Sequence, residues 1–172
     1  SWDFPIYFLI LLAVTAWLCY QNLGLTFQAI KNFSLFFIFY FISFILFSLP
    51  FHLRFSQIAQ GIALVHARSP FWQLFVLWGF PWFLTIVFLF FLAVKKLLIT
   101  NYKLLITDIF ILILIAIATL LIIVPEFVYV KDIYISSYHR ANTMFKLTYQ
   151  SFMLYAIAGG YIIVRILTSF SR

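Results

Sequence analysis

Charged residues are rare in this sequence, and acidic residues are the rarest of them. Asp and Glu together number 4 of 172 residues, and charged residues of all kinds make up 9%. A soluble domain carries charge on roughly a quarter of its residues, so an ordinary soluble globular protein is excluded. The hydrophobic share of 66% and the mean hydropathy of +1.14 predict an integral membrane protein instead.

Cysteine is nearly absent as well, which removes several kinds of site. The single Cys19 lies within an apolar run, so an intrachain disulfide is excluded. The sequence also lacks a P-loop, a GxGxxG motif and the spacing of a Ser/His/Asp triad.

The net charge of +7 is dispersed over short segments and forms no basic stripe. We therefore expect no nucleic-acid partner, and interpret this charge as what sets orientation in the lipid bilayer.

Long apolar runs predict an all-α bundle of about five membrane-spanning helices, since each crossing needs about 17–25 residues. Pro50 is expected to end the second helix, and Pro81 to kink the third or to mark its true beginning. A patch of small residues in the fifth should let another helix approach closely: Ala156, Ala158, Gly159 and Gly160. The predicted spans of this single domain are residues 4–20, 33–49, 72–94, 104–124 and 144–168.

The segments between these spans predict where the polar residues gather. Residues 51–70 are mildly amphipathic and are expected to lie in the membrane interface or in a re-entrant cavity. An odd number of crossings places this segment, the start of the chain and residues 125–143 on one side. The opposite side receives short basic segments, which are typical of the cytoplasm. The Pro125–Thr143 loop is thus predicted to be extracytoplasmic, in a multi-pass protein of the cell membrane.

The window from Pro125 to Gln150 holds the densest cluster of ionisable residues. Glu126 and Asp132 are candidate catalytic residues, because a carboxylate can act as a general base or bind a divalent metal. Arg140 and Lys146 are candidate phosphate ligands. The alternative is that these charges form salt bridges that tie the loop to its neighbours. If the chain is helical from Asn142, a polar face of five residues forms, which suggests a lined cavity or a Lys146 that snorkels: Asn142, Lys146, Tyr149, Gln150 and Met153.

Four further polar positions are expected on the same side. Arg54 and Arg68 are candidate headgroup or phosphate contacts, and His52 precedes the first of them. The histidines lack the tight spacing typical of a metal site. A divalent metal ion stays a candidate cofactor, and the sequence does not identify its ligands. Asp3 is either catalytic or the N-cap of the first helix.

Four segments of the sequence resemble the YYY membrane protein family, a set of uncharacterised multi-spanning proteins. They are SWDFPIY (1–7), LPFHLRF (49–55), PEFVYVKDIY (125–134) and HRANTMFKLTYQ (139–150). The family pattern matches Trp2, Asp3, Pro5, Tyr7, Pro50, Phe51, Glu126, Asp132, Arg140, Asn142, Thr143, Phe145 and Lys146. Ala141 stands where the family has Met, which is a minor departure.

This resemblance implies a fold and an activity. The family looks like the GT-C class of membrane glycosyltransferases, which use polyprenyl-phosphate sugars and place an acidic residue in an outer loop. It also implies that the chain is the later part of a larger protein, in keeping with its lack of an initiator Met. The remaining part of that protein would then be a partner and would supply part of the active site.

The function predicted is transfer of a sugar from a polyprenyl-phosphate donor at an outward-facing site. Asp3, Glu126 and Asp132 are the candidate catalytic residues. The candidate ligand-binding residues are His52, Arg54, Arg68, Arg140, Asn142 and Lys146. A non-enzymatic transport or lipid-binding scaffold is the alternative, in which the same charges would line a path or a headgroup site.

Overall fold

The computed structural model describes residues 3–54, 61–99, 102–131 and 138–170. Five helices within these ranges are long and apolar enough to cross a membrane, so the predicted all-α membrane bundle is confirmed. The chain divides into two compact units, residues 1–60 and 61–172, which are described separately below.

The first unit is a pair of antiparallel helices, α1 (Asp3–Leu23) and α2 (Phe27–His52). Gly24 makes the turn between them with a φ of 64°, a conformation that residues with a side chain rarely adopt. Thr26 then caps α2, because its hydroxyl accepts a hydrogen bond from the Ala29 N–H at 3.2 Å. The rings of Phe4 and Phe44 stack with their centroids 3.4 Å apart and join the two helices.

Helix α2 is longer than the predicted span at both ends. It begins at Phe27, six positions before the expected start, because Thr26 supplies the cap that the sequence interpretation overlooked. It also continues through Pro50 to His52, so the prediction that Pro50 ends the helix is wrong. A proline this near the end of a helix removes one backbone hydrogen bond, and the remaining turn still closes through the Leu53 N–H and the Leu49 carbonyl.

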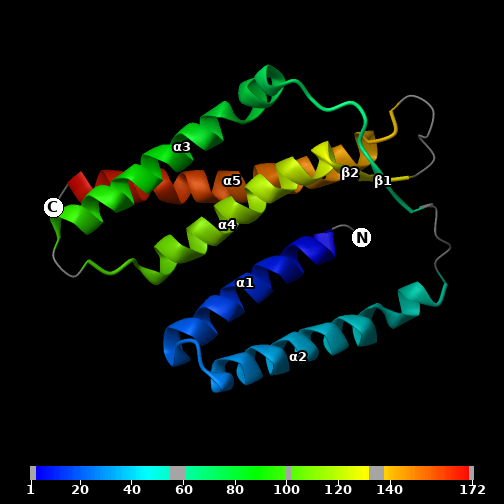
Figure 1. The fold of residues 1–172 in the computed structure, drawn as a ribbon, viewed down its shortest axis with the longest axis horizontal. Helices are drawn as coiled ribbons and strands as arrows, with labels where there is room; N and C mark the ends of the chain where they lie inside the picture. Colours follow the sequence, from blue (N-terminus) through cyan, green and yellow to red (C-terminus); the bar gives the residue numbers. More distant parts are fainter. Residues whose placement is uncertain (1–2, 55–60, 100–101, 132–137, 171–172) are drawn as a thin grey trace. The chain divides into compact units, whose positions relative to one another are not determined.

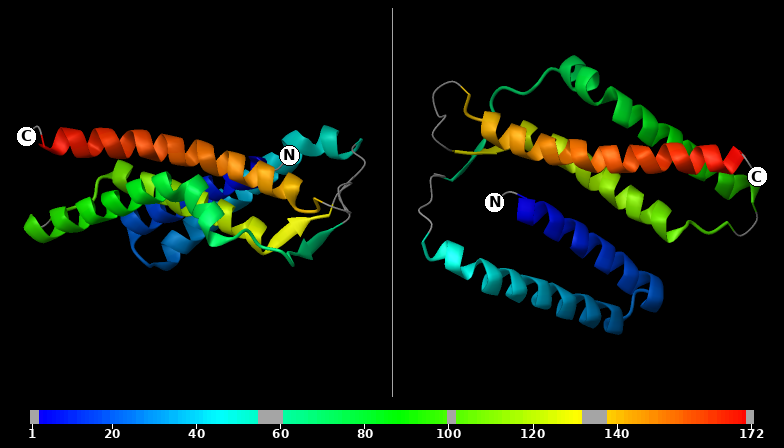
Figure 2. Two further views of the ribbon diagram at one scale, coloured as in Figure 1. Left: turned by 90° about the horizontal axis from the view of Figure 1, so that it is seen from above. Right: turned by 180° about the vertical axis from the view of Figure 1, so that it is seen from behind.

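The second unit contains three long helices, α3 (Phe71–Leu98), α4 (Ile106–Ile123) and α5 (Ala141–Phe170). Helix α5 packs along α4 and also contacts α3 (Figures 1 and 2). Pro81 lies inside α3, so the alternative in which it marks the start of that helix is wrong. Many large apolar side chains on these helices remain exposed, as expected of surfaces that face lipid.

The contact between α4 and α5 is built on small residues. Ala118 of α4 and Ala158 of α5 are fully buried. Ser151 of α5 donates a hydrogen bond of 2.8 Å to the Ala118 carbonyl. A Cβ placed on Gly159 would lie 3.4 Å from Leu84 of α3. The expected close approach is therefore seen at Ala158 and Gly159, whereas Gly160 faces open space.

A small antiparallel sheet closes one end of the second unit. Strand β1 (Ile62–Leu64) pairs with β2 (Val128–Val130), with Ala63 opposite Tyr129. The short 3₁₀ helix η1 (Val124–Glu126) connects α4 to β2. The described residues between 61 and 70 thus form a strand and a loop, and the placement of this segment in the membrane interface or a re-entrant cavity stays a prediction. The pairing brings the two segments predicted to share one side of the membrane into contact within this unit.

Candidate functional site

Glu126 is the central residue of the closed end of the second unit. Pro125 ends the regular helical hydrogen bonding after Ile123, and the tight turn of η1 directs Glu126 inward, where 7% of it is exposed. Its Oε2 accepts a hydrogen bond of 2.7 Å from the Ser69 N–H. The same oxygen lies 2.8 Å from Nη1 of Arg140. Two donors on one oxygen favour the charged carboxylate.

Arg140 joins three segments through one guanidinium. Besides the ion pair with Glu126, its Nη2 donates to the Ser69 hydroxyl at 3.0 Å. Its Nη1 also approaches the Pro125 carbonyl at 3.4 Å. For Glu126 and Arg140, the structure therefore shows the salt bridge that the sequence analysis gave as the alternative. This salt bridge ties the loop to its neighbours. A guanidinium carries five N–H donors, so this pairing leaves donor capacity on Arg140.

The strand that follows Glu126 is held against α5 by a buried hydroxyl. Thr143, of which 3% is exposed, accepts a hydrogen bond of 3.0 Å from the Val130 N–H. Arg68 lies on the other side of the same turn, with its guanidinium carbon 4.4 Å from the centre of the Phe127 ring. Arg68 is exposed, and among the described residues no carboxylate pairs with it. Its charge is thus held in place by the ring and left available.

Two hollows adjoin this cluster. The first, here called the arginine hollow, has a volume of about 450 Å³. Both Arg68 and Arg140 line it, together with Gln73, His139 and Ser69. Its other lining residues are Ala67, Pro70, Tyr138, Ala141 and Met144. The hollow places two cations on one surface, which is the arrangement that binds an anion such as phosphate.

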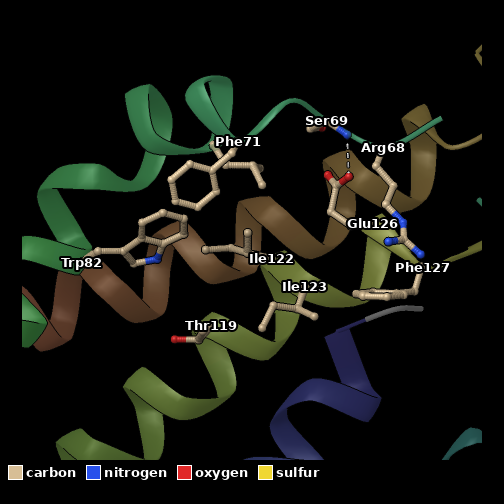
Figure 3. Close-up of a pocket in the computed structure, with 10 residues that line it drawn as sticks. Arg68, Ser69, Phe71, Trp82, Thr119, Ile122, Ile123, Glu126 and Phe127 are labelled. Carbon is tan, nitrogen blue, oxygen red and sulfur yellow. Dashed lines mark hydrogen bonds between the residues drawn. The ribbon is translucent and has the colours of Figure 1, made fainter.

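The second hollow, here called the apolar pocket, has a volume of about 350 Å³ and lies between the first turns of α3 and the last turns of α4. Figure 3 shows Phe71 and Trp82 on one side and Thr119, Ile122 and Ile123 on the other. Arg68, Ser69 and Glu126 form its polar end. Arg68 and Ser69 line both hollows, so the two hollows adjoin each other.

A second polar cluster occupies the opposite end of α4 and α5. Asp108 is fully buried, and its Oδ1 accepts hydrogen bonds from the Tyr161 hydroxyl at 2.7 Å and from Nε of Arg165 at 3.1 Å. Its Oδ2 accepts a bond of 3.2 Å from the Leu105 N–H at the start of α4. Both oxygens of Asp108 therefore accept hydrogen bonds, and the cluster links α4 to α5.

Four predicted site residues are not among the described residues of the second unit. Asp3 is the first residue of α1 and so lies in that helix and not before it, as a cap would; its side chain and that of His52 are outside what the structure describes. Arg54 is exposed beyond the end of α2. These three residues belong to the first unit. Asp132 lies outside the described residues.

The polar face predicted at the start of α5 is divided. Gln150 is buried, whereas Tyr149 and Met153 are 54% and 44% exposed, so the five residues differ in their surroundings. Asn142 and Lys146 are half-buried in the first turns of α5, and other residues line the two hollows. A helix that packs on two neighbours buries a face set by the packing, and here Thr143, Leu147 and Ser151 take those positions.

The sequence interpretation did not single out Ser69, Gln73, His139 or the pair of Asp108 and Arg165. Ser69 precedes Pro70 at the start of α3, and no local pattern reveals that its N–H faces Glu126. Asp108 and Arg165 did carry a signal, since an ionisable residue within an apolar span usually faces a partner in the bundle. Within the described ranges, no group of three or more His, Cys, Asp or Glu could hold a metal ion.

Comparison with known families decides the affiliation of the chain. A family model described as uncharacterized membrane protein (DUF2298) matches residues 1–107 and 91–155. The chain belongs to this family. No curated protein and no solved structure matches it. Membership of DUF2298 agrees with the membrane character of the helices, whereas the likeness to the YYY family and to glycosyltransferases remains a prediction.

Proposed function

We propose that this chain is the donor-binding part of a membrane glycosyltransferase whose sugar donor is carried on polyprenyl phosphate. The observation that carries the proposal is the arginine hollow, where Arg68 and Arg140 line one cavity at the end of membrane-length helices. Glu126 neutralises one of the two cations, so one positive charge is left for an anion. A lipid-linked phosphate needs a cationic site beside an apolar surface, and the exposed apolar residues of α3 supply that surface.

The chemistry follows from the charges. Transfer of the sugar leaves a phosphate whose negative charge grows in the transition state, and guanidinium donors already in place stabilise that charge. Arg68 supplies the cation that has no paired carboxylate among the described residues, and Arg140 supplies the cation that is paired with Glu126. Because Oε2 of Glu126 accepts from Ser69 and Arg140, Glu126 acts in this proposal as a positioning residue for Arg140. We assign the general base for the acceptor hydroxyl to Asp132.

Binding of polyprenyl phosphate to the purified protein in lipid nanodiscs tests the first half of the proposal. Unphosphorylated polyprenol is the matched ligand, and it should bind more weakly. Arg68→Ala should weaken binding of the phosphate about tenfold, the value of a hydrogen bond to a charged group. Lys131→Ala is the control, since Lys131 is exposed near the sheet and does not line the arginine hollow. Equal affinities for phosphate and alcohol would exclude this donor class.

Sugar transfer by the full-length protein tests the second half. With a radiolabelled polyprenyl-phosphate sugar, Asp132→Asn should abolish transfer and leave polyprenyl phosphate binding unchanged. Loss of binding in that variant would remove Asp132 from the role of base.

A lipid-binding scaffold is the second candidate, and one observation favours it. Two hydroxyls within the helix bundle are already hydrogen-bonded there: Ser151 bonds to Ala118 and Thr119 to Tyr155. A transport path needs available polar groups in mid-span. Of the two non-enzymatic functions, lipid-headgroup binding is therefore favoured over transport. Phosphate binding without any transfer would decide for the scaffold.

A further inference from the structure

Glu126 has one carboxylate oxygen that the described residues leave without a partner. Oε2 accepts two hydrogen bonds, whereas Oε1 is buried and meets no donor among the residues described. A buried acceptor of this kind costs about 1–3 kcal/mol when it is unpaired. Such a group either is a cost of folding or is satisfied by something that binds.

The position of Oε1 indicates which of these holds. Figure 3 shows this oxygen turned away from Arg68, toward the side of the apolar pocket where Phe71 lies. The rest of the pocket is formed by Trp82, Ile122 and other apolar side chains. A ligand here would place an apolar body against these residues and its polar end at Glu126. The pocket thus combines an apolar cavity with one buried acceptor, which is how small-molecule sites fix orientation.

We propose that the apolar pocket binds a membrane amphiphile whose polar end is a neutral hydroxyl group, and that this hydroxyl donates a hydrogen bond to Oε1 of Glu126.

The charges around the pocket select a hydroxyl over other polar ends. An ionised carboxylate accepts hydrogen bonds and donates none, so the ligand must supply the hydrogen. An ammonium group would bring it with a positive charge, but Arg68 and Arg140 already outnumber Glu126 there. A phosphate or carboxylate would place a second acceptor against Oε1. A long-chain or polycyclic alcohol meets both the charge and the shape.

This binding does not depend on sugar transfer, because the apolar pocket and the arginine hollow are lined by different sets of residues apart from Arg68 and Ser69. Absence of polyprenyl phosphate binding would leave it intact. Conversely, a failure of alcohol binding would leave the arginine hollow available for a phosphate.

Photolabelling with a matched pair of ligands tests the proposal. Hexadecanol that carries a diazirine is compared with its methyl ether, which has the same chain and no hydrogen to donate. In purified full-length protein, the alcohol should label peptides from 71–82 and 119–127 about tenfold more than the ether, as expected for a hydrogen bond to a charged group. Equal labelling by the two ligands, or labelling confined to other peptides, would overturn the proposal.

Two variants locate the effect. In Glu126→Gln the amide oxygen should take the place of Oε2, where Ser69 and Arg140 donate, and the NH₂ should face the pocket. The alcohol should then lose its advantage over the ether. Leu74→Trp should fill the pocket and reduce labelling by both ligands, whereas Val76→Trp, at an exposed position on the same helix, should not. If Glu126→Gln does not fold, the labelling ratio in the unaltered protein and the Leu74 variant still decide the matter. Unchanged labelling in Leu74→Trp would contradict the proposal.

Discussion

Nε of Arg165 lies 3.1 Å from Oδ1 of Asp108, a carboxylate that is fully buried at the start of α4. The other end of the same two helices has the same arrangement, with Nη1 of Arg140 2.8 Å from Oε2 of Glu126. In each pair the acid lies on or just beyond α4 and the arginine lies on α5 or directly before it. The helical rise between Asp108 and Glu126 is about 27 Å, close to the roughly 30 Å of the hydrocarbon core. The two ion pairs therefore lie near the two ends of a helix that is long and apolar enough to cross a membrane.

The unequal exposure of Asp108 and Arg165 leads to a prediction about stability. The Asp108 side chain is fully buried, whereas 22% of the Arg165 side chain is exposed. Arg165→Met, which leaves a buried carboxylate unpaired, should lower the free energy of unfolding by about 3–5 kcal/mol. Asp108→Leu should cost less, because the remaining guanidinium can reach water. The double variant should recover most of the loss.

Thermal unfolding in detergent measures these differences. Lys96→Met is the control, since it removes an exposed charge near the same end of the unit. If Arg165→Met and Lys96→Met lower the melting temperature equally, the Asp108 pair does not hold α4 to α5.

Thr143 should control the stability of β2. Its hydroxyl accepts from the Val130 N–H, and Thr143→Val keeps the shape while removing that acceptor. The buried amide would then be unpaired, at a cost of about 1–3 kcal/mol. Hydrogen–deuterium exchange should show faster exchange of the Val130 amide in this variant. Thr168→Val, which changes an exposed hydroxyl bonded within its own helix, should leave that amide protected.

The sidedness of the protein can be read by cysteine labelling. Tyr138 and Lys103 are exposed near opposite ends of the second unit, and orientation from the basic segments places Tyr138 outside. In a Cys19→Ala background, Tyr138→Cys should react with a membrane-impermeant maleimide added to intact cells, and Lys103→Cys should react only after lysis. The reverse pattern would invert the predicted topology and place the arginine hollow in the cytoplasm.

The long helices were predictable because hydrophobic length is a strong signal. Their ends were less so: the sequence interpretation overlooked the cap at Thr26 and gave Pro50 too much weight, although near a helix end it removes a single bond. The sheet could not be foreseen. Its strands have three residues each, and Ala63 meets Tyr129 across a long stretch of chain that contains the two long helices α3 and α4.

The candidate site was predictable only in part, because sequence shows where charges gather but not which segments meet in the fold. The density of charge between Glu126 and Arg140 marked one segment, and Arg68 was named for its headgroup chemistry. That Arg68 and Arg140 line one hollow depends on the β1–β2 pairing and on the turn at Ser69, which are tertiary contacts. The buried pair of Asp108 and Arg165 was not singled out from the sequence. Its partners lie on different helices, and helical spacing alone does not reveal which faces meet.

The account depends on one arrangement above all, the closure of residues 61–70 over residues 125–130 and Arg140 to form a single site. An engineered disulfide between Leu64→Cys and Val128→Cys, in a Cys19→Ala background, tests it directly, since these residues lie opposite each other in the sheet. The control pair Leu64→Cys and Val130→Cys has the diagonal spacing of about 7–8 Å, which is too wide for ready bridging. We predict that mild oxidation in native membranes joins the first pair nearly completely and the second hardly at all, as measured by mobility after proteolytic cleavage between the cysteines. Failure of the first pair to form, or equal formation of both, would contradict the single site.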